Sequence, residues 1–297
     1  MILEERMYYR RKLLLALLEV FDDNLNNTDC EKLLFNFCKI TGKNHYDFFP
    51  YHFGPFSFVS YYDKRRLTEL GLLKATQDFR LNTRHSYLKE LESSDKRVLL
   101  ALKSSGVLGN RLIKKTYIEN PQFTARSEIL TKLFSPKEIR QLQFAWNTDS
   151  KPFVFTIGYE GETIDSFLYK LISNNIMAVV DVRSNPQSMK YGFSKKSFSD
   201  YIEKAGIKYF HIPELGIPSA MRKGLGISIS HKKLFRRYET KLLPKQEAAK
   251  LQLLKLIDKY PRIALVCFEA NYQFCHRNTL LEYLKKEKSL PKSVMHL

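Results

Sequence analysis

The residues best able to do chemistry are concentrated near the end of the chain, in the segment RIALVCFEANYQFCHRNTLLE (residues 262–282). An apolar run over residues 263–268 predicts a strand buried on both faces. Glu269 follows this strand, and Cys275 and His276 fall near the start of the helix predicted next. Glu269 could act as a general acid or base. Cys275 beside His276 could be a thiolate nucleophile of lowered pKa, or a small packing residue.

Arg277 lies in the first turn of the same predicted helix, where the helix macrodipole favours anions over cations. A local rule broken without visible gain indicates a candidate functional site. The unpaired N–H groups of the helix start would hold an anion beside Arg277.

Zinc is an alternative use of four residues in this segment, Cys267, Glu269, Cys275 and His276. There is no CxxC or HxxxH spacing, and adjacent ligands are awkward in a tetrahedral site. We therefore expect no metal and no cofactor, with Cys267 a packing residue. The chain also lacks a GxGxxG motif, a Walker A loop and an HxE…PCxxC deaminase set, which disfavours a nicotinamide enzyme or an ATPase.

The elements that must position these residues alternate between strand and helix. Strands are predicted at residues 153–157, 177–182, 209–212, 263–268 and 294–297, and helices at residues 163–173, 197–205, 232–259 (a pair) and 277–286. This alternation predicts an α/β fold, with a mostly parallel Rossmann-like sheet flanked by helices.

Polar clusters follow the first four predicted strands. Ligands of open parallel sheets bind outside the carboxyl ends of the strands, so the clusters indicate one shared site. The substrate-binding candidates are Tyr159, Arg183, Ser184, Glu214, Arg222 and Arg277. Asp181 is a further candidate acid or base, or else the partner of an arginine in an ion pair. His211 is a weaker candidate, as often structural.

The motifs TIGYEG, DVRSNPQS, FHIPELG and CFE…CHR occur in this order over residues 153–297. In them the chain resembles the domain-of-unknown-function 488 family. The resemblance implies a fold and a site more firmly than a reaction.

The first half of the chain is predicted to be mainly helical. Helices are expected at residues 6–22, 28–42 and 56–70, with an aromatic segment at 46–58 and a ribbon ending at residue 81. Thr28 or Asp29 can cap the second helix, Gly42 can end it, and Ile40 is expected to face the core. This order is typical of a winged helix.

The pieces KLLFNFCKITG, YHFGPFS and LTELGLL resemble phage-associated winged-helix proteins of the Panacea/SocA antitoxin type, over residues 10–80. In such a fold, Lys64, Arg65 and Arg66 would face phosphates; the alternative is a solvated helix face. The linker-like residues 147–152 place a boundary near residue 150, between a nucleic-acid-binding domain (1–150) and an α/β domain (151–297).

The formal net charge of +18 favours a polyanionic partner, and we expect nucleic acid, DNA in the first place, ahead of a membrane. Residues 1–150 hold 24 Lys and Arg against 18 Asp and Glu, whereas residues 151–297 hold 25 against 13. Lys190, Lys195 and Lys196 would make the mouth of the site cationic. The alternative is a merely soluble basic protein.

Four scattered cysteines make a disulfide framework unexpected, no apolar run is long enough to span a membrane, and we expect no signal peptide. We therefore expect a cytoplasmic protein.

Two hypotheses follow. In the first, the protein is an enzyme that hydrolyses nucleic acid or a nucleotide-like substrate, by base removal or strand cleavage, with Glu269 or Asp181 as the catalytic carboxylate. In the second, it is a DNA-binding regulator or sensor whose α/β domain binds an anion without turning it over. A third, less favoured, is an antitoxin-like binder of a protein partner.

Overall fold

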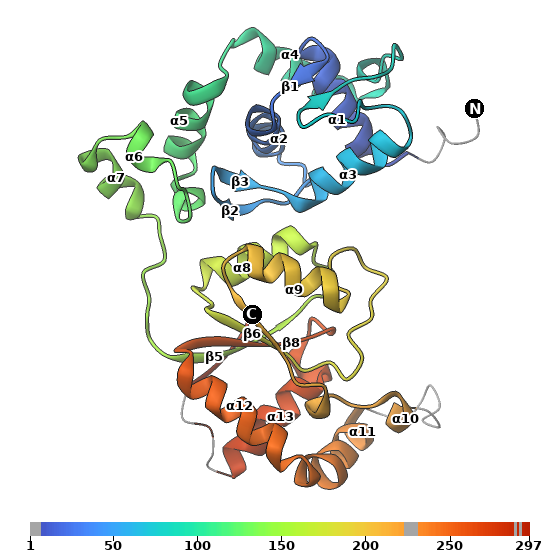
Figure 1. Cartoon of the computed structure of the whole chain (residues 1–297), viewed down its shortest axis with the longest axis vertical. Coiled ribbons are helices and arrows are strands. Elements are labelled where there is room, and N and C mark those ends of the chain that lie inside the picture. The colour runs from blue at the N-terminus through green and yellow to red at the C-terminus, as the bar shows by residue number, and fades with distance from the viewer. Residues whose placement is uncertain (1–6, 223–230, 288–289, 291–292) are drawn as a thin grey trace. The chain divides into compact units, whose positions relative to one another are not determined.

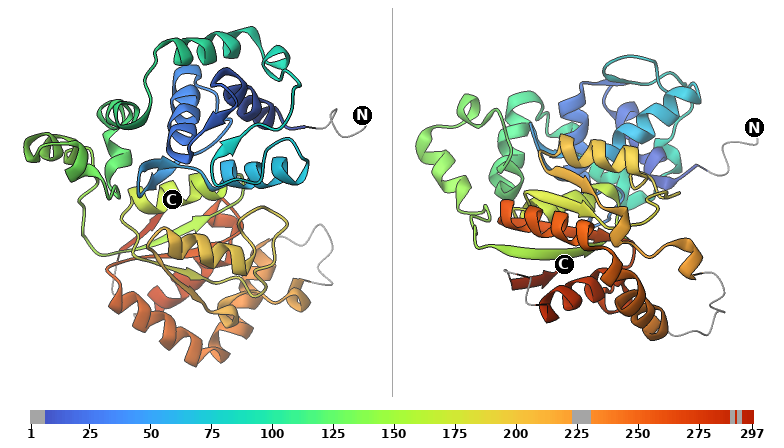
Figure 2. Two further views of the ribbon diagram at one scale, coloured as in Figure 1. Left: turned by 45° about the horizontal axis from the view of Figure 1, so that its top comes forward. Right: turned by 60° about the horizontal axis from the view of Figure 1, so that its bottom comes forward.

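The computed structural model describes residues 7–222, 231–287, 290 and 293–297. The chain divides into two compact units, Met1–Trp146 and Asn147–Leu297. Figure 1 labels their elements, and Figure 2 shows each unit from two further directions. Within the described residues, no helix has the length and apolar character needed to cross a membrane.

The first unit is mainly helical. Its helices and strands are α1 (Tyr9–Val20), β1 (Asn24–Leu25), α2 (Asn27–Thr41), β2 (Phe49–Tyr51), β3 (Gly54–Phe56), α3 (Phe58–Glu69), β4 (Phe79–Arg80), α4 (Ser93–Ser104), α5 (Gly109–Glu119), α6 (Leu130–Leu133) and α7 (Pro136–Gln143). Strands β2 and β3 form an antiparallel hairpin, and β1 pairs antiparallel with β4.

Helix α2 shows where local rules succeed and where they fail. Gly42 ends it in the left-handed conformation (φ 67°), as predicted. The capping residue is Asn26, whose side chain accepts a hydrogen bond from the Asp29 N–H, so the predicted cap at residue 28 or 29 is wrong. Ile40 is 61% exposed instead of facing the core.

The second unit is an α/β fold. Its elements are β5 (Phe153–Gly158), α8 (Ile164–Ser173), β6 (Ala178–Asp181), α9 (Lys195–Lys204), β7 (Lys208–His211), α10 (Ser219–Arg222), α11 (His231–Arg237), α12 (Glu247–Lys259), β8 (Arg262–Cys267), α13 (His276–Lys286) and β9 (Ser293–His296). The five strands have the order β7-β6-β8-β5-β9, and every pair is parallel. The predicted Rossmann-like class is confirmed.

Helices cover both faces of this sheet: α8 and α9 lie on one, α12 and α13 on the other (Figure 1). Val180 and Leu265 pack with Leu253 of α12 and Leu281 of α13 in one buried cluster. Strands β6 and β8, with every residue buried, are therefore covered on both sides, which explains their continuous apolar runs.

The strand order creates a crevice between β6 and β8. The chain leaves β6 toward its edge neighbour β7, whereas it leaves β8 toward β9, on the other side of β5. Connections that diverge from neighbouring strands mark the usual ligand site of open α/β sheets.

Candidate functional site

Two glycines let the loops above the sheet approach one another closely. A Cβ atom on Gly158, at the end of β5, would lie 1.8 Å from the carbonyl oxygen of Glu269. A Cβ on Gly216 would lie 2.2 Å from the backbone nitrogen of Ser184. Only glycine fits at either position, so the backbones that carry Glu269 and Ser184 are held against neighbouring loops.

Arg277 is buried and holds the loop after β8. Its guanidinium donates to the carbonyl of Glu269, and Nη2 donates to the carbonyl of Ala270 at 3.0 Å. Its Nε is buried without a hydrogen-bond partner among the described residues. The prediction that Arg277 binds a substrate anion is therefore wrong, because its side chain is enclosed and committed to the backbone.

Asp181, the last residue of β6, and Arg183, in the loop that follows, form a buried ion pair. Asp181 Oδ1 accepts from Arg183 Nε at 2.8 Å, and Oδ2 accepts from Arg183 Nη2 at 2.6 Å and from the Tyr209 hydroxyl at 2.9 Å. Asp181 is fully buried. The structure thus supports the ion-pair alternative for Asp181 and corrects its assignment as a catalytic acid or base.

Arg183 is also largely occupied. Its Nη1 donates to the Tyr159 hydroxyl at 2.9 Å and to the Phe193 carbonyl at 2.8 Å. Together with the bonds to Asp181, these contacts use four of the five guanidinium N–H donors. Burial alone would lower the pKa of Arg183, but hydrogen bonding and the charge of Asp181 raise it. The prediction that Arg183 binds a substrate phosphate through two parallel hydrogen bonds is therefore wrong.

A pocket of about 330 Å³ opens at the carboxyl ends of β5, β6 and β8. Its lining residues are Tyr159, Arg183, Ser184, Asn185, Gln187, Ser188, Ser219, Cys267, Phe268 and Glu269. Three predicted substrate-binding residues and Glu269 meet here. Glu214 is exposed and does not line this pocket. The side chain of Arg222 lies outside the described part of the chain.

Sequence reasoning did not single out five of these residues, namely Asn185, Gln187, Ser188, Ser219 and Phe268. The first three belong to the DVRSNPQS motif, so the motif itself was the available signal. The neutral side chains of these residues carry no charge and no acid–base group, so their types alone do not indicate a site.

The Glu269 side chain reaches two thiols at the edge of this pocket. Its Oε2 accepts from Cys275 Sγ at 3.0 Å and from Cys267 Sγ at 3.2 Å. Burial raises the pKa of Glu269, but these thiols and the nearby His276 more than reverse that, so the pKa lies below its usual value. Burial raises the pKa of Cys275, which favours the packing alternative over a thiolate of lowered pKa in the metal-free protein.

His276 completes this group and sits on the first residue of α13. Its Nδ1 lies 3.5 Å from Cys267 Sγ and 4.0 Å from Cys275 Sγ, and its Nε2 lies 3.1 Å from the Val182 carbonyl oxygen. One ligand atom from each of Cys267, Glu269, Cys275 and His276 lies within 4.8 Å of the others. Adjacent residues are awkward as ligands of one metal, but here Cys275 is extended (φ −125°, ψ 139°) just before the helix. The side chains of Cys275 and His276 can therefore both reach the cluster.

The candidate cations differ in exposure. Lys195 and Lys196 are exposed at the start of α9, whereas Lys190 Nζ donates to the Tyr159 carbonyl at 3.0 Å. Nearer the sheet, His211 Nε2 lies 2.9 Å from the Arg183 carbonyl oxygen, which fits its structural alternative.

The three basic side chains of α3 differ in how accessible their charged groups are. Lys64 Nζ donates to the Gln77 carbonyl and lies 4.5 Å from the centre of the Phe79 ring, so it is turned onto its own unit. Arg65 and Arg66 are exposed, and both lie near Glu69. The prediction that Lys64 faces phosphates is wrong, whereas the other two remain accessible.

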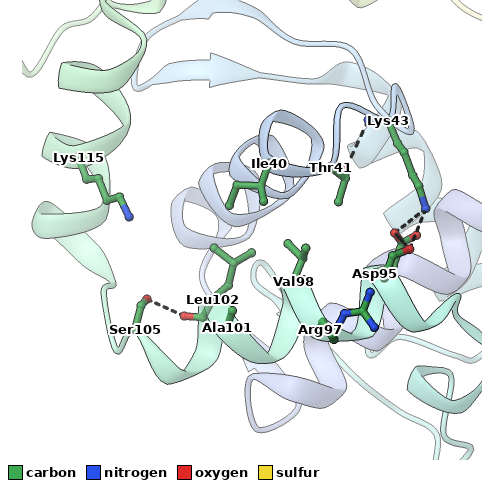
Figure 3. Close-up of a pocket in the computed structure, with 11 residues that line it drawn as sticks. Ile40, Thr41, Lys43, Asp95, Arg97, Val98, Ala101, Leu102, Ser105 and Lys115 are labelled. Carbon is green, nitrogen blue, oxygen red and sulfur yellow. Dashed lines mark hydrogen bonds and ion pairs between the residues drawn. The ribbon is translucent and has the colours of Figure 1, made fainter.

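A larger cavity, of about 630 Å³, lies in the first unit between α2, α4 and α5 (Figure 3). Ile40, Val98 and Leu102 contribute its apolar walls, and Lys43 pairs with Asp95 at one end. None of the predicted site residues lines it.

A search of curated proteins and a search of solved structures each find no match. The winged-helix resemblance of the first unit therefore stays a prediction. In the α/β unit, residues 163–284 match the family model described as Domain of unknown function DUF488, which confirms the resemblance for that part of the chain.

Proposed function

We propose that the α/β unit is a hydrolase that acts on nucleic acid or a nucleotide-like substrate in the pocket at the carboxyl ends of β5, β6 and β8. The observation that carries this proposal is the lining of the pocket: one carboxylate, Glu269, stands among amides, hydroxyls and aromatic rings. The volume of about 330 Å³ is at the lower end of the range for small-molecule sites.

The polar lining suits a nucleoside better than an isolated anion. Asn185 and Gln187 each carry both donors and acceptors, as the edge of a base requires. Phe268 is 45% exposed and packs edge-on against Tyr159, with ring centres 5.3 Å apart. An exposed ring at a pocket wall can stack on an unpaired base, for about 1–3 kcal/mol per base.

Glu269 would act as the general base. It would accept a proton from a water molecule as the water oxygen bonds to the substrate carbon or phosphorus. The bond to the leaving group would break at the same centre, and the leaving group would take its proton from solvent. Such proton transfer typically contributes about 10²–10⁴-fold in rate.

The alternative, a sensor that binds an anion, needs free cations in the pocket. Arg183 has at most one N–H left, and Arg277 does not line the pocket. Because these arginine side chains already donate to groups of the protein, the pocket favours the enzyme over the sensor. For the grip on nucleic acid, the exposed Arg65 and Arg66 support the first unit as a binding module, and the larger excess of cations in residues 151–297 supports a contribution from the α/β unit.

The test is to incubate the full chain with modified and unmodified DNA and RNA and to identify the products by mass. Glu269→Gln is expected to lower turnover by about 10²-fold or more. Glu214→Gln, the matched change at an exposed carboxylate outside the pocket, should leave turnover intact. Binding without any product from wild type would support the sensor instead.

A further inference from the structure

Four side chains with transition-metal ligand atoms converge at the end of β8, and we propose that Cys267, Glu269, Cys275 and His276 bind one zinc ion. Tetrahedral zinc with ordinary bond lengths places its ligand atoms about 3.5–3.8 Å apart. The separations between His276 Nδ1 and the two sulfurs, 3.5 and 4.0 Å, bracket that range. The carboxylate oxygen lies 3.0 and 3.2 Å from the sulfurs, and no two of the four ligand atoms are more than 4.8 Å apart, so side-chain adjustments would bring all four to bonding distance.

The backbone sets the tautomer that a metal ligand needs. His276 Nε2 lies 3.1 Å from the carbonyl oxygen of Val182, which can only accept a hydrogen bond. Nε2 must therefore carry the proton, and Nδ1 presents its lone pair to the sulfurs. In metal sites, the histidine nitrogen that is not bound to the metal commonly donates its hydrogen bond to a carbonyl oxygen of this kind.

Residues outside the proposed ligand set hold the loop after β8 in this conformation. Arg277 donates to the carbonyls of Glu269 and Ala270, and Gly158 admits the Glu269 backbone. Tyr238, fully buried, packs edge-on against the His276 ring. The four ligand positions are therefore fixed before an ion enters, which lowers the entropy lost on binding.

The chemistry of the set selects the ion. Two thiols and an imidazole suit zinc, whereas magnesium and calcium take oxygen ligands. Cys267, Cys275 and His276 are each no more than 2% exposed. Among the ion pairs of the described residues, none provides a cation for the Glu269 carboxylate, and a divalent ion would supply that charge.

Evidence for metal binding does not require the hydrolase proposal, but the two uses of Glu269 compete, because a carboxylate bound to zinc is a much weaker proton acceptor than a free one. With four protein ligands, the ion would tie the loop after β8 to the start of α13, as in structural zinc sites. Because Cys267 and Glu269 also line the pocket, the ion would lie at the pocket wall.

The test uses the full chain, stripped with a chelator, reloaded with zinc and freed of excess ion. Elemental analysis should give one zinc per chain. Cys275→Ser and His276→Gln should lose it, whereas Cys38→Ser, at a buried cysteine of the first unit, should retain it. Cobalt added to the stripped wild-type protein should give intense thiolate-to-metal charge-transfer bands and the visible spectrum of tetrahedral cobalt.

The cobalt spectrum needs no variant, so a variant that fails to fold does not remove the test. Substoichiometric zinc in the wild type, or cobalt without thiolate bands, would overturn the proposal. Because no substrate is involved, these results are independent of whether the protein hydrolyses anything.

Discussion

The Nε2 atom of His276 lies 3.1 Å from the main-chain carbonyl oxygen of Val182, and this contact joins the start of α13 to the end of β6. Val182 directly follows β6, and α13 belongs to the connection that leaves β8, so the contact spans the two strands whose connections diverge. The contact directs Nδ1 toward Cys267 and Cys275, and so it links the topology of the sheet to the chemistry at its rim.

Arg277→Met should destabilise the α/β unit by about 2–4 kcal/mol, because the carbonyls of Glu269 and Ala270 would lose their buried donor. The measurement is urea unfolding followed by circular dichroism. Arg236→Met, at an exposed position of α11, is the matched control and should change the midpoint little. Equal midpoints for the two variants would show that Arg277 does not hold the loop.

Gly158→Ala should displace the loop that carries Glu269, since the added Cβ would lie 1.8 Å from the Glu269 carbonyl oxygen. We expect several kcal/mol of destabilisation together with loss of zinc. Gly161→Ala meets no atom within 4 Å but has a φ of +78°, so it should cost only about 1–2 kcal/mol. Similar losses for the two variants would contradict the close approach at Gly158.

The first unit should lose stability as pH rises from 5 to 7. Burial raises the pKa of Glu31 to about 7, from an ordinary 4.5, despite hydrogen bonds from Ser60 and Ser57. A raised folded-state pKa gives stability that is complete below the unfolded value and lost as pH rises through the folded value. At about 1.4 kcal/mol per pKa unit, the loss is at most about 3 kcal/mol.

Trp146, the single tryptophan, reports on this unit because its indole donates to the Thr124 hydroxyl. The urea midpoint of its fluorescence should fall between pH 5 and 7, and Glu31→Gln should flatten that fall. Burial lowers the pKa of neighbouring Lys32 to about 8, so its titration lies above this window. Burial lowers the pKa of His45, which opposes the fall, so the comparison with Glu31→Gln isolates the carboxyl. The same pH dependence in wild type and Glu31→Gln would show that Glu31 is not buried as an acid.

Binding to duplex DNA should weaken with salt, with a slope of about −0.9 for each phosphate contacted. Arg65→Gln, at an exposed position of α3, should reduce the slope by about one contact for every sequence tested. Lys132→Gln removes an exposed cation of α6 and is the matched control. Affinity unchanged between low and moderate salt would remove the case for a polyanionic partner.

The strands of the α/β unit could be predicted because each is a short apolar run between polar turns. Their order could not, because it depends on packing between segments far apart in the chain. The same limit explains the arginines: the sequence located Arg183 and Arg277 at the rim, but not the carboxylate and carbonyls that occupy their donors. Spacing argues against zinc at Cys267, Glu269, Cys275 and His276, because a sequence does not show that Cys275 is extended just before its helix.

Glu269 lines the pocket as its proposed general base and also lies among the proposed zinc ligands. The most direct measurement is the mass of products from DNA and RNA incubated with wild type, Glu269→Gln and Glu214→Gln, each before and after zinc is restored. We expect cleaved or base-free product from metal-free wild type and Glu214→Gln, less product once zinc occupies the carboxylate, and none from Glu269→Gln. Undiminished product from Glu269→Gln, or none from metal-free wild type with any substrate, would contradict the role of Glu269 as the base.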